Sequence, residues 1–156
     1  MTGRLAVPSW VPASSLVLSA GGVGVSGYLT YEHYNASSSL ACPETATFNC
    51  LKVTTSEWST FVGIPVALLG LVFFVAMAGW CLPAVWRIGD ARVRRGRVAA
   101  AVVGVGFALY LIWAELFKVD SICLWCTAAH AISVVLLFVV LLGTAYLEPA
   151  DELPAG

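Results

Sequence analysis

Charged side chains are scarce in this chain of 156 residues: Asp, Glu, Lys and Arg together make up 11%, against about 25% in an ordinary soluble domain. Hydrophobic residues account for 60%. Four uncharged stretches, at 5–31, 58–86, 98–114 and 121–147, are each close to or beyond the roughly 20 residues that a membrane-spanning helix needs. These stretches exclude a sizeable soluble domain and indicate a membrane protein.

The pattern predicts one all-α integral membrane domain over 1–156, a four-transmembrane-helix bundle. We place its helices at about 14–31, 60–83, 98–117 and 121–147, the outer loop at 32–59, the cytoplasmic loop at 84–97 and a disordered tail at 148–156. Within the outer loop, Thr54 or Thr55 is expected to cap a short helix or half-helix that continues through Trp58 toward the second span.

Basic residues are absent from most of the sequence, and the few present indicate an orientation. Five arginines lie between 87 and 97, and Arg4 precedes the first span, whereas Lys52 and Lys118 lie at the opposite end of the predicted bundle. Because short loops rich in Lys and Arg lie on the cytoplasmic side of the membrane, we expect both chain ends and the arginine segment in the cytoplasm. A short juxtamembrane loop of this sign is what topology requires, so we expect no nucleic-acid partner.

Cysteines number five, and four of them fall on the predicted outer side. Cys123 and Cys126 form a C-x-x-C motif at the start of the last helix, where unpaired N–H groups and the helix dipole stabilise a thiolate. That position favours thiol–disulfide exchange over a structural role. Cys42 and Cys50 by themselves favour a structural disulfide in the loop. Cys81, near the cytoplasmic end of the second span, is expected to be an inert buried thiol.

His130 lies seven residues after Cys123, and at about 100° per residue it falls on the same helix face as Cys123 and Cys126. Two thiolates and an imidazole can bind zinc, so a metal site is one interpretation, and a polar residue satisfied inside the bundle is another. The motif is not C-x-x-C-H, which excludes covalent haem attachment. We predict no metal.

With these residues in place, the chain resembles bacterial homologues of vitamin K epoxide reductase (VKOR) over about 16–142. The resemblance rests on a combination of elements in the family's order, each weak alone. They are Cys42 and Cys50 with seven residues between them, Ser56 six residues after Cys50, the Gly63-Ile64-Pro65 segment, and Cys123 and Cys126 at the start of the last helix.

The resemblance implies a quinone-dependent thiol–disulfide oxidoreductase in which a four-helix bundle encloses the quinone, menaquinone or ubiquinone. It assigns Cys123 and Cys126 as the active-site pair and Cys42 and Cys50 as the loop pair that shuttles electrons. Ser56 matches a serine near the quinone head group. His130 falls where the animal enzymes have a tyrosine that contacts substrate or inhibitor, which makes a ligand contact a better interpretation than zinc.

Some bacterial relatives carry a thioredoxin-like domain, but this sequence has no second C-x-x-C, so we expect a separate DsbA-like thioredoxin-fold protein as redox partner. The expected location is the bacterial inner (cytoplasmic) membrane, with lipid around a multi-pass chain and the active site on the extracytoplasmic side. A DsbB-type oxidoreductase is an alternative with the same role, although its cysteine pairs come in the reverse order. A small membrane scaffold or transporter built around Glu115 is a second alternative, because acidic residues within spans are costly and usually functional.

Overall fold

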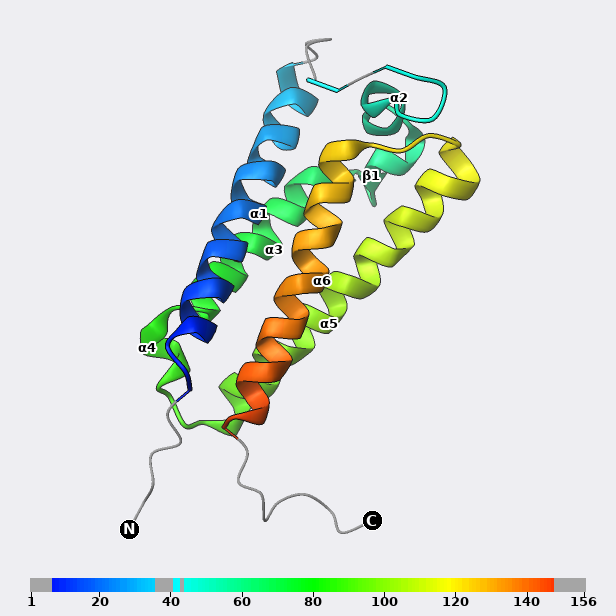
Figure 1. Cartoon of the computed structure of the whole chain (residues 1–156). Helices are drawn as coiled ribbons and strands as arrows, with labels where there is room; N and C mark the ends of the chain where they lie inside the picture. The colour runs from blue at the N-terminus through cyan, green and yellow to red at the C-terminus, as the bar shows by residue number, and fades with distance from the viewer. Residues whose placement is uncertain (1–6, 36–40, 43, 148–156) are drawn as a thin grey trace, which may run out of the picture.

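Four long helices form the body of the protein in the computed structural model, which describes residues 7–35, 41–42 and 44–147. They are α1 (Trp10–Asn35), α3 (Val66–Trp80), α5 (Ala91–Ala114) and α6 (Leu124–Ala145). Helix α1 packs against α3 and α6, and α5 packs mainly against α6 (Figure 1). The expected four-helix bundle is therefore present as a packing arrangement, while the tail predicted at 148–156 lies outside the described residues.

Two of these helical segments are long and apolar enough to cross a membrane, namely Ala91–Val119 and Leu124–Ala145, and α3 is a shorter apolar helix. The bundle core contains Phe74, Met77 and Leu136, all of which are buried. At Gly22 of α1, a Cβ atom would collide with the Phe74 ring. A glycine at this position therefore lets α1 and α3 approach closely.

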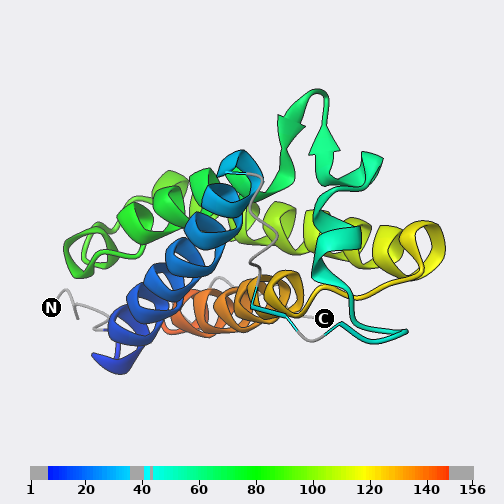
Figure 2. The ribbon, with the colours of Figure 1, turned by 90° about the horizontal axis from the view of Figure 1, so that it is seen from above.

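The second predicted helix begins later than expected, because a β-hairpin occupies its first residues. Strand β1 (Thr60–Phe61) pairs with β2 (Ile64–Pro65), and Val62 and Gly63 turn the chain with φ values of 53° and 79°. A positive φ ends regular helix, and Pro65 has no N–H to donate. Helix α3 starts only at Val66, and the hairpin stands out from the bundle in Figure 2.

The expected cytoplasmic loop at 84–97 is shorter than predicted. A short helix, α4 (Pro83–Trp86), precedes it, and α5 begins at Ala91, because the Asp90 side chain accepts a hydrogen bond from the N–H of Arg92 at 2.7 Å and caps the helix. Most of the arginine segment thus lies within the first turns of α5. At this end Arg97 is buried and lies 3.4 Å from the centre of the Trp86 ring.

The opposite end holds the short elements between α1 and α3. Helix α2 (Cys50–Thr54) is followed by a 3-10 turn (Glu57–Ser59). The cap of α2 is Asn49, whose side chain accepts from the N–H of Lys52 at 2.8 Å, so the expectation of a helix capped by Thr54 or Thr55 is wrong. Thr54 instead donates to the Cys50 carbonyl at 2.9 Å, inside the last turn of α2.

Candidate functional site

A short parallel bridge joins the outer loop to the segment that leads into α6. The N–H of Ile122 donates to the Thr47 carbonyl at 2.9 Å, and the N–H of Asn49 donates to the Ile122 carbonyl at 3.2 Å. Phe48 and Ile122 are the bridged pair. Because the two segments run parallel here, the residues that follow, Cys50 and Cys123, come to the same place in the fold.

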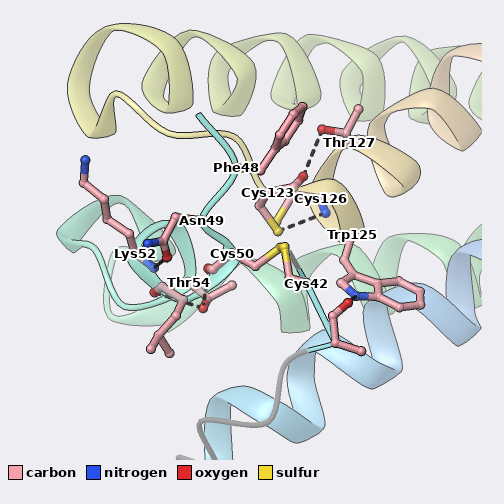
Figure 3. Close-up of a disulfide and its surroundings, with 12 residues drawn as sticks. Cys42, Phe48, Asn49, Cys50, Lys52, Thr54, Cys123, Trp125, Cys126 and Thr127 are labelled. Carbon is pink, nitrogen blue, oxygen red and sulfur yellow. Dashed lines mark hydrogen bonds between the residues drawn. A yellow bond between two sulfur atoms is a disulfide. The ribbon is translucent and has the colours of Figure 1, made fainter. Parts of the chain in front are cut away.

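Cys42 and Cys50 form a disulfide, with their Cα atoms 6.1 Å apart. Figure 3 shows this disulfide next to the Cys123 side chain, and Cys50 and Cys123 belong to one buried cluster. The two ends of the disulfide differ in access: Cys50 is 1% exposed, whereas Cys42 is half-buried. An incoming thiol therefore has access to Cys42 rather than to Cys50.

The backbone next to Cys42 is held by both α1 and α6. The indole N–H of Trp125 donates to the Ala41 carbonyl at 3.0 Å, and the Ala41 N–H donates to the Tyr28 hydroxyl at 3.2 Å. The Trp125 and Tyr28 rings lie 4.9 Å apart. Trp125, the second middle residue of the C-x-x-C motif, thus connects the loop disulfide to the start of α6.

Cys123 is the N-cap residue of α6, and its sulfur accepts a hydrogen bond from the N–H of Cys126 at 3.2 Å. A hydrogen bond from the Cys126 side chain, together with the backbone N–H groups of Cys126 and Trp125, holds the pKa of the Cys123 thiol below its ordinary value. Cys123 and Cys126 are both free thiols. The Cys42–Cys50 pair is therefore oxidised and lies beside a reduced Cys123–Cys126 pair, in which Cys123 is stabilised as a thiolate.

Glu115 lies against this pair, which the sequence alone did not predict. A π-helix (Glu115–Val119) ends α5, and the Glu115 carboxylate accepts from the N–H of Cys123 at 3.4 Å and lies next to the Cys126 side chain. The side chain is 6% exposed. In the sequence, Glu115 is noticeable only as an acidic residue in an apolar run, eight residues before Cys123. That pattern indicates the functional charge of a scaffold or transporter and does not connect Glu115 to the cysteines.

A cavity of about 560 Å³ opens beside Cys126. Its walls are mostly apolar side chains of α1, α3, α5, α6 and the hairpin, including Leu29, Phe61, Ile64, Phe73, Phe107 and Leu111. Cys126, Glu115, His33 and His130 are its titratable lining groups. His130 is buried, and its Nδ1 has no hydrogen-bond partner among the described residues. The cavity is therefore apolar with a few polar groups in its wall, as small-molecule sites are.

Ser56 is not among the residues that line this cavity. Its hydroxyl donates to the Val53 carbonyl at 2.8 Å, and its own carbonyl accepts from the Ser59 hydroxyl at 2.7 Å. Thr54, Trp58 and Ser59, which surround it in sequence, do line the cavity. Ser56 thus orders the segment that carries lining residues, and a direct ligand contact stays a prediction.

The zinc interpretation finds no geometric support in the part of the chain that is described. Within 7–35, 41–42 and 44–147, no three His, Cys, Asp or Glu side chains are grouped as a metal ion requires. Cys123, Cys126 and His130 share a helix face, but the imidazole lies one turn deeper in the bundle. Cys81 is buried at the other end, in the cluster of Phe74, Met77 and Leu136.

Comparison with known families agrees with the elements of this site. The model of the vitamin K epoxide reductase family matches residues 14–141. The match includes both cysteine pairs, the hairpin, Glu115 and His130, and it runs from α1 into the last turns of α6.

Proposed function

The chain belongs to the vitamin K epoxide reductase family, which makes it a membrane thiol–disulfide oxidoreductase, and we propose the path that its electrons take. They pass from a reduced DsbA-like thioredoxin-fold protein to Cys42 and Cys50, then to Cys123 and Cys126, and then to a quinone. The result of turnover is a disulfide in the partner protein and a reduced quinone in the membrane. The role of the protein is therefore to support disulfide bond formation.

One observation carries this proposal: Cys123 lies between the Cys42–Cys50 disulfide and Cys126, and Cys126 lines the cavity. A structural staple would not need to lie against the reduced C-x-x-C pair. The exposures of the four cysteines also follow the proposed order. The most accessible sulfur of the loop pair belongs to Cys42, and Cys50 is in contact with the next pair.

Each step of the proposed exchange breaks one disulfide bond and forms another. A partner thiolate attacks Cys42 and displaces the Cys50 thiolate, and the second partner thiol then releases Cys42 while the partner becomes a disulfide. The Cys50 thiolate attacks Cys123 of an oxidised Cys123–Cys126 pair and displaces the Cys126 thiolate. Cys42 then attacks Cys50, which restores the loop disulfide and leaves Cys123 and Cys126 reduced. The net result is the transfer of two electrons and two protons from the partner dithiol to the Cys123–Cys126 pair.

The cavity fits a quinone head group in volume, polarity and placement of polar atoms. Quinones are used by the family in general, and a bound quinone would supply an acceptor for two electrons and two protons. Cys126 would face it, and the unpaired Nδ1 of His130 would gain a hydrogen-bond partner, as buried polar groups require. Apolar walls exclude water from that end of the cavity. Menaquinone and ubiquinone both fit this volume, polarity and placement of polar atoms.

The proposed location is a bacterial inner membrane, crossed by α1, α3, α5 and α6, with the redox site on the extracytoplasmic side. Supporting this, the arginine-rich start of α5 lies at the same end as the start of α1 and the end of α6 (Figure 1), where Val11, Trp86 and Val139 pack together. The cysteine pairs lie at the other end. Positive-inside orientation then puts the disulfide chemistry in an oxidising compartment.

The test is quinone reduction by the purified full chain in lipid nanodiscs, supplied with a reduced DsbA-like protein. We expect one quinone to be reduced for each partner disulfide formed, measured by quinone absorbance and by thiol titration of the partner. Oxidation of the partner without quinone loss would contradict the proposed acceptor. Quinone loss only with small thiols, never with the protein partner, would contradict the proposed donor.

A further inference from the structure

Glu115 is buried at the junction of the C-x-x-C pair and the cavity, and we propose that it is a catalytic residue that accepts the proton of the Cys126 thiol and delivers it into the cavity. This inference rests on the proposed function, because it concerns the step in which Cys123 and Cys126 lose their electrons. It adds a proton carrier to a path that otherwise consists of sulfur atoms.

The contacts of Glu115 support a role in proton transfer. One carboxylate oxygen accepts the N–H of Cys123 at 3.4 Å, which fixes the carboxylate near the pair. The Cys126 side chain lies next to the same carboxyl group, and both residues line the cavity, so donor and acceptor of the proposed proton are neighbours. Geometry of this kind is the first requirement for a general base.

The local backbone brings the carboxylate to this place. Instead of ending in an α-helical turn, α5 widens into the π-helix Glu115–Val119, and the N–H of Ser121 donates back to the Glu115 carbonyl at 3.2 Å. Asp120 follows with a φ of 52°. Short π-helical turns are frequent at functional sites. Here the turn brings the Glu115 carboxylate within reach of the Cys123 N–H.

The charge environment also favours a proton carrier over a structural ion pair. No basic side chain of the described residues forms an ion pair with Glu115, whose polar neighbours are the N–H of Cys123 and the Cys126 side chain. Lys118, three residues on, lies instead 5.3 Å from the Trp113 ring centre. A buried carboxylate without a cation is costly, and a proton taken from the neighbouring thiol removes that cost.

The other titratable groups in the cavity wall are less well placed for this step. His130 lies on α6 one turn beyond Cys126, and His33 reaches the cavity from α1. Among the described residues, neither imidazole is hydrogen-bonded to the Cys126 sulfur, and Nδ1 of His130 has no partner. His130 is therefore free to contact a ligand, whereas Glu115 contacts the reacting sulfur.

The proposed step balances in protons and electrons. The reduced pair holds two transferable electrons and one thiol proton, on Cys126, because Cys123 is a thiolate, and it ends as a Cys123–Cys126 disulfide. Glu115 takes the Cys126 proton, so that a thiolate and a carboxylic acid replace a thiol and a carboxylate. Both electrons leave to the quinone through Cys126 as the sulfur–sulfur bond forms. One proton follows from Glu115, which returns to a carboxylate, and the second comes from water, which took up the Cys123 proton when that thiol ionised.

Glu115→Gln is the test, because glutamine keeps an oxygen that accepts the Cys123 N–H but loses the negative charge and with it the ability to take a proton. Asp120→Asn is the matched control: it makes the same carboxylate-to-amide change five residues away at an exposed position, and asparagine tolerates a positive φ. In single-turnover reduction of a water-soluble short-chain quinone by the dithiothreitol-reduced full chain, we expect Glu115→Gln to be slower by about 10²- to 10⁴-fold. Asp120→Asn should equal the wild type.

Two further measurements separate proton transfer from a structural role. In quinone-free protein, iodoacetamide should modify Cys126 of Glu115→Gln at the wild-type rate or faster, because the amide leaves the thiol as accessible and removes a negative charge beside the thiolate. The quinone rate of the variant should also rise with pH toward the wild-type rate, since hydroxide replaces the missing base. Adducts are assigned to Cys126 by fragment mass spectrometry.

The outcomes separate this inference from the proposed function. A Glu115→Gln variant that reduces quinone at the wild-type rate overturns the inference alone. A variant in which alkylation and quinone reduction fall together, at every pH, also overturns it, because Glu115 would then only hold the fold. Failure of the wild type and of Asp120→Asn to reduce quinone overturns the proposed function, and this inference with it.

Discussion

Cys50→Ser distinguishes two roles for the Cys42–Cys50 disulfide, an electron carrier and a staple that only holds the outer loop. The cysteines are eight residues apart in sequence. In the chain-entropy model, opening a loop of this length costs about 2.5 kcal/mol of folding free energy. Cys50 is also 1% exposed, so a serine hydroxyl without a partner there adds about 1 to 3 kcal/mol. Both roles therefore predict a less stable protein.

The two roles differ in turnover per folded molecule. If the disulfide carries electrons, Cys50→Ser should abolish quinone reduction driven by the DsbA-like partner, because no thiolate is left to attack Cys123. Dithiothreitol should still reduce the Cys123–Cys126 pair and drive quinone reduction. If the disulfide is only a staple, both activities should fall in proportion to the folded fraction.

The assay compares the two electron donors on one preparation, with folded protein quantified by size-exclusion chromatography. Cys42→Ser is the matched control, because it removes the same disulfide and costs the same loop-closure free energy, yet keeps the Cys50 thiol. That thiol should become trapped in a disulfide with Cys123, visible by non-reducing mass spectrometry. Partner-driven quinone reduction by Cys50→Ser at near wild-type specific activity would refute the shuttle and leave a single-pair enzyme.

Four further predictions address the inner pair, the orientation, Ser56 and acid titration. Cys126→Ser should stall electrons upstream and accumulate a Cys50–Cys123 disulfide, because the Cys123 thiolate can attack Cys50 of the loop disulfide and displace Cys42; its absence from peptide maps of protein with an oxidised loop pair would contradict the order of exchange. In intact cells, a membrane-impermeant maleimide should label Cys42 after reduction but not a cysteine placed at Gly89, and labelling at Gly89 would reverse the orientation. Ser56→Ala removes the hydrogen bond to the Val53 carbonyl and should weaken quinone binding by about 1 kcal/mol, measured by titration of bound quinone; an unchanged affinity removes Ser56 from the site. Because the pKa of Cys123 is lowered, its thiolate should persist below the pH at which ordinary thiols protonate, so the ultraviolet thiolate absorbance of the reduced protein should show a low-pH step that is missing in Cys123→Ser.

The long helices were predictable because burial in a bundle or in lipid requires uncharged runs, and those runs are visible in the sequence. The ends of these helices were less predictable. The run that begins at Trp58 stays apolar through the hairpin, where Phe61 and Ile64 are as hydrophobic as any helix residue. Only Gly63 and Pro65 signal the turn. At the other end, the charge of the arginine segment marks where the apolar run stops, but a capped helix extends into it.

The cysteine pairs were recognisable from spacing and order, and their placement side by side agrees with the geometry of the loop. Glu115 was visible as an unusual charge but could not be assigned to the redox site from sequence. Its approach to Cys123 depends on a π-helical turn and on the positive φ of Asp120, and neither has a reliable residue signature. Sequence spacing within one helix is informative, whereas contacts across a tight connection depend on backbone conformation.

In the proposed path, the burial of Cys50 and Cys123 explains how a strong oxidant in the membrane can act on one protein partner without oxidising every thiol outside. Cys50 and Cys123 are 1% and 0% exposed, so the exchange between them takes place in a buried part of the protein. Access to a sulfur affects the rate of thiol–disulfide exchange, whereas reduction potentials set its equilibrium. In the proposed path electrons from a protein donor enter at Cys42, whose neighbouring backbone is held by Tyr28 and Trp125, and leave at Cys126. The direction of flow is then set by the quinone, and the choice of donor is set by whatever protein surface can reach the Cys42 sulfur.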